Sequence, residues 1–271
     1  MNELIIEAGR GERQYWRDLW RYRELFCFLA WRDILVRYKQ TVIGVSWSVI
    51  RPLLTMTVLT IVFGRLAKMD SGGVPYPILV FCGMLPWQFF ATAFAESGNS
   101  LVANSGMISK VYFPRLVVPF SSVMTSFVDF LISSVLMAGL MVIYGFSPGP
   151  GIWLLPLFIV LAFATAFGAG LWVSALMVRY RDFRYIVPFV VQFGLYISPV
   201  GFSSSVVPEH LRMLYSINPM VGVIDGFRWA ILGENNLYLP GLWISVAGVV
   251  VIIVTGIWYF RKTERTFADV I

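Results

Sequence analysis

Charged residues are scarce in this sequence. Lys, Arg, Asp and Glu make up 13% of the 271 residues, whereas soluble domains carry about a quarter charged residues. Hydrophobic residues make up 58%, the mean hydropathy is +0.75, and apolar runs of about twenty residues recur, the length that a hydrocarbon core about 30 Å thick requires. This composition excludes an ordinary soluble domain and indicates a multi-pass membrane protein.

The residues of soluble-enzyme chemistry are equally sparse. His210 is the only histidine and is expected outside the membrane, so we expect no histidine-based triad, relay of histidines or zinc site with the usual ligands. Cys27 and Cys82 form no CxxC pattern, so we interpret them as lone thiols. No Gly-Lys dipeptide occurs, which excludes the phosphate-binding loop GxxxxGK[ST]. We therefore expect no enzyme activity, catalytic residue, metal or bound cofactor in this chain.

The apolar runs predict an all-α integral membrane protein. A cytoplasmic and interfacial segment is expected at 1–40 and a six-helix transmembrane domain at 41–271. Within residues 13–40, apolar side chains share one helical face, which is typical of an amphipathic helix at the membrane surface. This helix is either a simple anchor or part of a cytoplasmic interface. The apolar face comprises Cys27, Trp31, Ile34, Leu35 and Tyr38, and the six spans lie at about 43–64, 75–95, 117–144, 152–178, 186–202 and 240–260.

The orientation follows from the distribution of Lys and Arg. If both termini are cytoplasmic, sixteen of these residues lie inside and four outside, as the positive-inside rule requires. We interpret the net charge of +6 in the same way, as contact with anionic lipid head groups rather than with nucleic acid. The loop at 96–116 is then a polar and basic cytoplasmic connection. Residues 203–238 form the outer segment, with a helix from Pro219 to Gly233 that is too short to span.

Some polar and aromatic residues inside the spans have two interpretations. Asp129 is either a proton or cation site or a hydrogen-bond partner of neighbouring helices. Arg51 either meets an anionic head group or extends to the cytoplasmic surface. Aromatic residues share one face of the second span and one face of the fifth, where they either pack helices together or line a path for sugars. These aromatics are Trp87, Phe90, Phe94, Phe189, Phe193 and Tyr196.

Four stretches resemble one family. They are "RDILVRYKQTVIGVSWSVIRPLL" (32–54), "NSGMISKVYFPRLVVP" (104–119), "VRYRDFRYIVPFVVQ" (178–192) and "INPMVGVIDGFRWAILG" (217–233). Together with the order of the spans, they resemble the membrane subunit of type-2 ABC exporters, in particular permeases that export O-antigen, capsular or teichoic-acid glycans on a polyprenyl lipid. Arg51 departs from the family, which more often has an apolar or aromatic residue there.

The resemblance implies a homodimer in the bacterial cytoplasmic membrane, bound to two copies of a separate subunit that uses ATP and Mg. The substrate is expected to be a polyprenyl-pyrophosphate-linked polysaccharide, and the alternative is a small hydrophobic compound or a lipid. A membrane-embedded sugar transferase would need a carboxylate cluster at the membrane surface, which the sequence lacks.

The resemblance also implies roles for particular residues. Contact with the ATPase is expected from Ser105, Met107, Ile108, Lys110, Tyr112, Arg181 and Asp182. Guanidinium and ammonium groups pair well with phosphate oxygens, and the candidates for binding the pyrophosphate are Arg37, Lys39, Arg51, Arg115 and Arg179. The glycan path is expected to include Trp47 and the six aromatics above. An outer gate is expected at Asn218, Pro219, Asp225 and Arg228, the last two paired at i,i+3.

Overall fold

The structure is a computed structural model that describes residues 12–39, 44–233 and 237–267. All of the regular secondary structure in these ranges is helical. The first eleven residues of the expected interfacial segment and the expected start of the first span at residue 43 lie outside the described residues.

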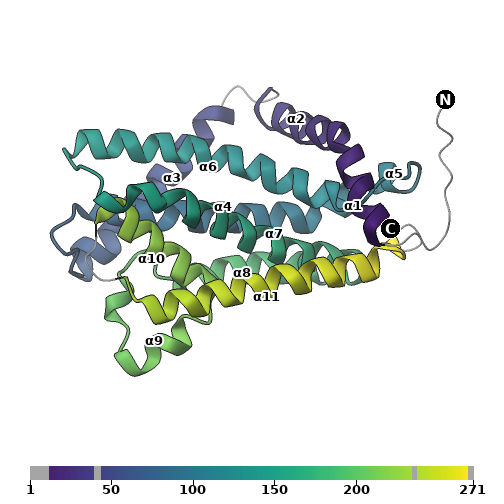
Figure 1. The fold of residues 1–271 in the computed structure, drawn as a ribbon. Coiled ribbons are helices and arrows are strands. Elements are labelled where there is room, and N and C mark those ends of the chain that lie inside the picture. The colour runs from purple at the N-terminus through teal and green to yellow at the C-terminus, as the bar shows by residue number, and fades with distance from the viewer. Residues whose placement is uncertain (1–11, 40–43, 234–236, 268–271) are drawn as a thin grey trace.

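The helices succeed one another with short connections (Figure 1). In chain order they are α1 (Glu12–Arg21), α2 (Arg23–Lys39), α3 (Gly44–Leu59) with a π-helical continuation η1 (Thr60–Leu66), α4 (Tyr76–Ala103), α5 (Ser105–Ile108), α6 (Val117–Ile143), η2 (Pro150–Leu154), α7 (Leu155–Arg179), α8 (Phe183–Ile197), η3 (Ser204–Val206), α9 (Glu209–Tyr215), α10 (Pro219–Leu232) and α11 (Leu239–Glu264).

Five of the described helical segments are long and apolar enough to cross a membrane. They are Ser46–Leu66, Tyr76–Ala103, Val117–Ile143, Pro150–Arg179 and Leu239–Glu264. The expected fifth span corresponds to α8, whose 15 residues reach about 22 Å. This helix ends at Ile197 because Ser198 precedes a proline and takes an extended conformation, with ψ 149°. The all-helical architecture with several spans is thus confirmed. The helix at the expected fifth span, α8, is shorter than a full span.

The central helix is α4, which packs against α6, α7 and α10. It corrects the expectation that residues 96–116 form a loop, because it continues to Ala103. The polar residues in this stretch are accommodated inside the helix: the Ser100 hydroxyl donates to the Ser97 carbonyl over 2.6 Å, and Leu101 is fully buried. Small polar residues allow close helix packing, which is why a polar stretch remains helical here.

The last long helix, α11, lies along α7 at very short range. A Cβ atom on Gly168 would lie 2.8 Å from Ile253 Cα, and one on Gly256 would lie 2.5 Å from the Gly168 carbonyl oxygen. Glycine at these two positions therefore lets the two backbones touch. Nearby, the Trp172 ring stacks on Tyr259, with ring centroids 4.3 Å apart.

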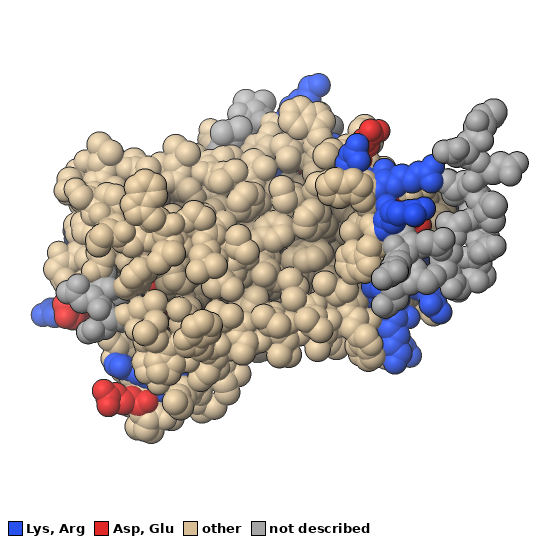
Figure 2. Space-filling view, in the orientation of Figure 1, with Lys and Arg blue, Asp and Glu red and all other residues tan. Residues whose placement is uncertain are grey.

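The two ends of the bundle differ in composition. One end carries α1, α5 and the C-terminal end of α11, and the other carries α9, α10 and η1 (Figure 1). The Tyr15 hydroxyl of α1 donates to the Glu264 carboxylate of α11, which joins the two described chain ends. Lys and Arg gather at this end, and a broad uncharged surface covers the middle of the bundle (Figure 2).

The N-terminal segment forms two helices and packs on the bundle. Leu29 of α2 is fully buried, in a cluster that includes Leu116 and Val117. Cys27 and Trp31, two members of the expected apolar face of this helix, are exposed. The residues that fix α2 to the bundle are therefore mostly outside the face that the sequence emphasised.

Candidate functional site

A cavity of about 350 Å³ opens between α2, α3, α4 and α6. Its polar residues come from all four helices, and aromatic rings of α3, α4 and α6 complete the wall. The lining residues are Arg37, Trp47, Ser48, Arg51, Pro52, Leu85, Gln88, Phe89, Thr92, Glu96, Asp129, Phe130 and Ser133. This volume lies at the lower end of the range for small-molecule sites, about 300–1,000 Å³.

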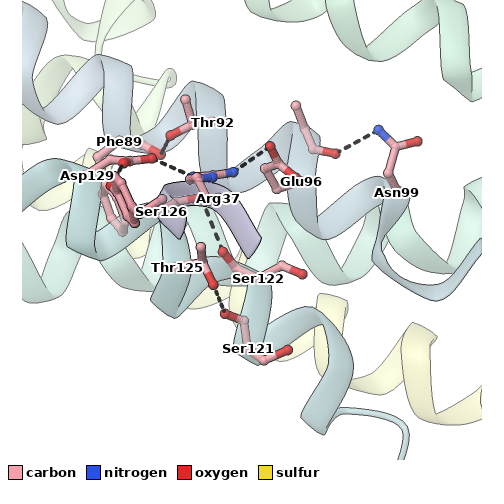
Figure 3. Close-up of polar contacts among 12 residues, drawn as sticks. Arg37, Phe89, Thr92, Glu96, Asn99, Ser121, Ser122, Thr125, Ser126 and Asp129 are labelled. Carbon is pink, nitrogen blue, oxygen red and sulfur yellow. Dashed lines mark hydrogen bonds and ion pairs between the residues drawn. The ribbon is translucent and has the colours of Figure 1, made fainter. Parts of the chain in front are cut away.

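Arg37 is the centre of an ionic cluster in the wall of this cavity. Its Nη1 donates to Asp129 Oδ2 over 2.5 Å, and its Nη2 donates to Glu96 Oε1 over 2.7 Å. Figure 3 shows the Arg37 side chain pointing between these two carboxylates, which come from α6 and α4. One arginine thus links three helices.

Asp129 also accepts a hydrogen bond from the hydroxyl of Tyr38. Burial, with the nearby Asp129 carboxylate, raises the pKa of Tyr38 to about 12, so the phenol stays a donor at neutral pH. Of the two interpretations of Asp129, the structure shows the hydrogen-bonded one, since its carboxylate joins α6 to two successive residues of α2.

Arg51 and Trp47 lie one turn apart on α3 and line the same cavity. Arg37 has both of its acidic partners in the wall, whereas Arg51 is exposed and has no hydrogen-bonded or ionic partner among the described residues. The cavity therefore offers one guanidinium held by carboxylates and one available to an anionic ligand.

The structure does not bring the other three expected cations to this cavity. The backbone N–H of Arg115 donates to Glu264 Oε1 over 2.8 Å, and its guanidinium donates to the Glu264 carbonyl, so Arg115 joins α6 to α11. Lys39 is exposed at the end of α2. Arg179 lies over the Tyr180 ring, 5.5 Å from its centroid, at the end of α7.

Glu96, Gln88 and Thr92 are cavity residues that the sequence-based reasoning missed. They lie at i, i+4 and i+8 on α4, and this polar stripe on one helical face was a readable signal. Glu96 was not predicted to lie in a helix of the membrane domain because it falls one residue beyond the expected end of the second span.

The structure separates the expected path aromatics into two groups. Trp87 and Phe94 are 6% and 7% exposed and belong to the core, which corrects the idea that all six rings are open to a path. Phe189 and Phe193 of α8 are 64% and 54% exposed and stack on each other, with ring centroids 5.6 Å apart. Tyr196, on the same helix, is also exposed.

The expected ATPase-contact residues lie at the basic end of the bundle. Ile108 of α5 is 3% exposed and packs in the same cluster as Leu29, so it anchors α5. Lys110 and Tyr112 follow in an exposed turn, and Met107 is partly buried against that cluster. Two more of these residues, Arg181 and Asp182, are exposed in the turn between α7 and α8, and Ser105 begins α5.

At the opposite end, α10 forms as expected. Asn218 caps it by accepting from the Met220 N–H, Pro219 is its first residue, and Gly233 ends it with φ 71°. The helix is buried against α4, α7 and α11 rather than lying on the surface. The expected pairing of Asp225 with Arg228 stays a prediction.

Arg228 of α10 is fully buried and holds the segment that follows α8. Its guanidinium donates to the carbonyls of Phe202 and Val200 over 2.6 and 3.1 Å, while the Tyr76 hydroxyl of α4 donates to the Gly201 carbonyl over 2.8 Å. Three successive carbonyls are thus bound by side chains of two other helices. We call this arrangement, Tyr76 and Arg228 on residues 200–202, the carbonyl clamp.

The fold and this site define a polytopic membrane protein with a charged cavity between α2, α3, α4 and α6. Within the described ranges, no three His, Cys, Asp or Glu side chains lie close enough to hold a metal ion.

Residues 24–232 match the model of the ABC-2 type transporter family, and the chain belongs to this family. It is a permease subunit and a multi-pass protein of the inner membrane. The resemblance noted in the four sequence stretches is thereby confirmed.

Curated relatives match over most of this chain. It is 28% identical to the O-antigen export system permease protein RfbA of Klebsiella pneumoniae over 251 residues, which cover 92% of this chain and 95% of the relative. It is 27% identical to the protein of the same name in Myxococcus xanthus, over 93% of this chain and 97% of the relative. It is 22% identical to the inner membrane transport permease YadH of Escherichia coli K12, over 78% of this chain and 84% of the relative.

Proposed function

We propose that this chain is the membrane subunit of an ATP-driven exporter that moves a polyprenyl-pyrophosphate-linked polysaccharide out of the cytoplasm. Two copies of the chain associate with two copies of a separate ATPase, which binds ATP and Mg. Similarity to O-antigen export permeases over more than nine tenths of the chain supports this substrate class. Both termini are cytoplasmic in this proposal, because the basic end of the bundle carries α1 and the end of α11.

The observation that carries the proposal is the cavity between α2, α3, α4 and α6, which we call the inner cavity. Arg51 presents a guanidinium that has no partner among the described residues, and Arg37 presents one that two carboxylates hold in place. A pyrophosphate has several anionic oxygens, and the guanidinium of Arg51 can bind phosphate oxygens in a bidentate manner. The Trp47 ring beside Arg51 is half exposed and provides a flat apolar surface for the adjoining sugar or lipid.

The exposed rings of α8 support passage of a sugar chain. Phe189, Phe193 and Tyr196 present flat faces with few rotatable bonds, so contact with a moving chain costs little conformational entropy. At the basic end, the exposed turn at Lys110 and Tyr112 is anchored by the buried Ile108. A displacement of this turn by the ATPase would be transmitted to α4 and α6 because α5 is short and packed.

The alternative substrate is a small hydrophobic compound or a lipid, as suits the more distant similarity to a transport permease of unspecified cargo. Such a cargo would need the exposed rings but not a guanidinium at the cavity. Arg51 therefore discriminates between the two substrate classes.

The test measures ATP hydrolysis by the complex in lipid nanodiscs with Arg51→Gln. The control is Arg65→Gln, which removes an exposed arginine from η1, at the far end of the same membrane segment. We expect the polyprenyl-pyrophosphate glycan to stimulate the wild type and the control, and to stimulate Arg51→Gln at least several-fold less. The proposal fails if the lipid without its sugar and pyrophosphate stimulates equally, and the role of Arg51 fails if both variants respond like the wild type.

A further inference from the structure

A second cavity lies at the end of the bundle away from α1 and α5. Its volume is about 710 Å³, twice that of the inner cavity at about 350 Å³, and the two share no lining residue. It is bounded by the loop 67–74 after η1, by η3 with α9, and by one side of α10. Its hydroxyl-bearing residues are Ser71, Ser203, Ser204, Ser205, Tyr215, Ser216 and Tyr238.

Tyr215 lines this cavity, but its hydroxyl has essentially no accessible surface there. It is shielded from solvent and has no hydrogen-bond partner among the described residues. Burial, with the nearby carboxylate of Asp225, raises the pKa of Tyr215, so its phenol stays protonated. A ligand in the cavity therefore meets the Tyr215 ring and the serine hydroxyls of the wall rather than the tyrosine hydroxyl.

The charges around the cavity argue against an anionic ligand. The guanidinium of Arg212 is used on the backbone, since it donates to the carbonyls of Val207 and Ser205 over 3.1 and 3.2 Å. The other cation, Lys68, is balanced in the lining by acids, among them Asp225. The lining suits a neutral polyol. The hydroxyls of a polyol can donate hydrogen bonds to, and accept them from, the serine hydroxyls and the carboxylate of Asp225, and its C–H faces can lie on the two tyrosine rings.

We propose that this outer cavity binds sugar units of the exported chain as they leave the membrane. The serine hydroxyls of the wall bond to sugar hydroxyls, the carboxylate of Asp225 accepts from a sugar hydroxyl, and the Tyr215 ring lies against a sugar face. The inner cavity selects the charged lipid head group and the outer cavity holds the neutral polymer, so the two ends of the permease read different parts of one substrate. This inference rests on the proposed function and adds a second substrate site to it.

The first test fills the cavity with Ser204→Trp, a substitution of a partly exposed residue in η3. The matched control is Met213→Trp, which adds the same ring to α9 at an exposed position outside the cavity lining. In cells that make the polymer, we expect Ser204→Trp to lower surface glycan at least five-fold and Met213→Trp to leave it unchanged, at equal amounts of chain in the membrane. In the purified complex, lipid-linked glycan should still stimulate ATP hydrolysis by Ser204→Trp, because the inner cavity is intact.

The second test measures occupancy without filling the cavity. Ser204→Cys is made in a chain whose exposed Cys27 is replaced by serine, while the buried Cys82 is kept. A membrane-impermeant maleimide should label this cysteine several-fold more slowly in cells that make the polymer than in cells that do not. Tyr215→Ala should remove most of that protection, whereas Tyr215→Phe, which keeps the ring, should retain it.

Normal surface glycan in Ser204→Trp, or equal labelling with and without polymer, would overturn the outer site and leave the proposed function standing. A wild-type complex that places no glycan outside would overturn the proposed function itself, and the outer site with it.

Discussion

Neutralising Asp129 should weaken the attachment of α2 more than neutralising Glu96, although both carboxylates bind the same arginine. The Asp129 side chain is 25% exposed and that of Glu96 is 51% exposed. A hydrogen bond to a charged group in a partly buried site contributes about 1.5–3 kcal/mol, whereas an exposed ion pair contributes about 0–1 kcal/mol. Asp129→Asn should therefore lower the free energy of unfolding by about 1.5–3 kcal/mol, and Glu96→Gln by less than about 1 kcal/mol.

The assay is equilibrium unfolding of the purified chain in detergent micelles, with Arg37→Gln and the double variant completing a cycle. The loss in Arg37→Gln with Asp129→Asn should be smaller than the sum of the single losses by about 1–2 kcal/mol, because both remove one contact. Lys39→Gln, at the exposed end of the same helix, is the control and should change nothing measurable. Equal losses for the two acids, or strict additivity in the cycle, would refute the cluster as the attachment of α2.

Three further changes test other parts of the fold. Gly194→Val places a Cβ atom 2.5 Å from the Trp87 ring and should lower stability by about 1–3 kcal/mol through overpacking between α8 and α4. The measurement is the melting temperature, which should fall; an unchanged melting temperature would contradict that contact. Arg228→Met leaves two buried carbonyls without donors, costing about 1–3 kcal/mol each, and should speed proteolysis after α8, which an unaltered cleavage rate would contradict. Asp182→Asn lies in an exposed turn and should change stability by less than about 0.5 kcal/mol while abolishing substrate-stimulated ATP hydrolysis; retained stimulation would exclude a coupling role.

The parts of the fold that sequence predicted well depend on local chemistry. Helix α10 begins and ends where Asn218, Pro219 and Gly233 indicate, since a cap, a first-turn proline and a left-handed glycine act within one turn of the chain. The long apolar spans are found because hydrocarbon thickness sets their length. The end of α8 was less well predicted: the expected span ran to 202, whereas the helix ends at Ile197, before the proline that follows Ser198.

The parts that sequence did not predict depend on packing between distant segments. The polar stretch around Ser97 is helical because α7 covers it and because the Ser100 hydroxyl bonds within the helix, and neither fact is visible in local composition. Likewise, the partners of Arg37 lie 59 and 92 residues away, so no local pattern identifies them. The carbonyls that Arg228 binds belong to a segment 26 and 28 residues away, so they too could not be identified from local sequence.

The most direct test of the proposed exporter is purification of the tagged chain from its own membranes. The account predicts that an ATPase co-purifies in a 1:1 ratio, two copies with two, and that a polyprenyl-pyrophosphate glycan stimulates its ATP hydrolysis several-fold. A chain that purifies without an ATPase, or a complex whose hydrolysis ignores the glycan, would contradict it.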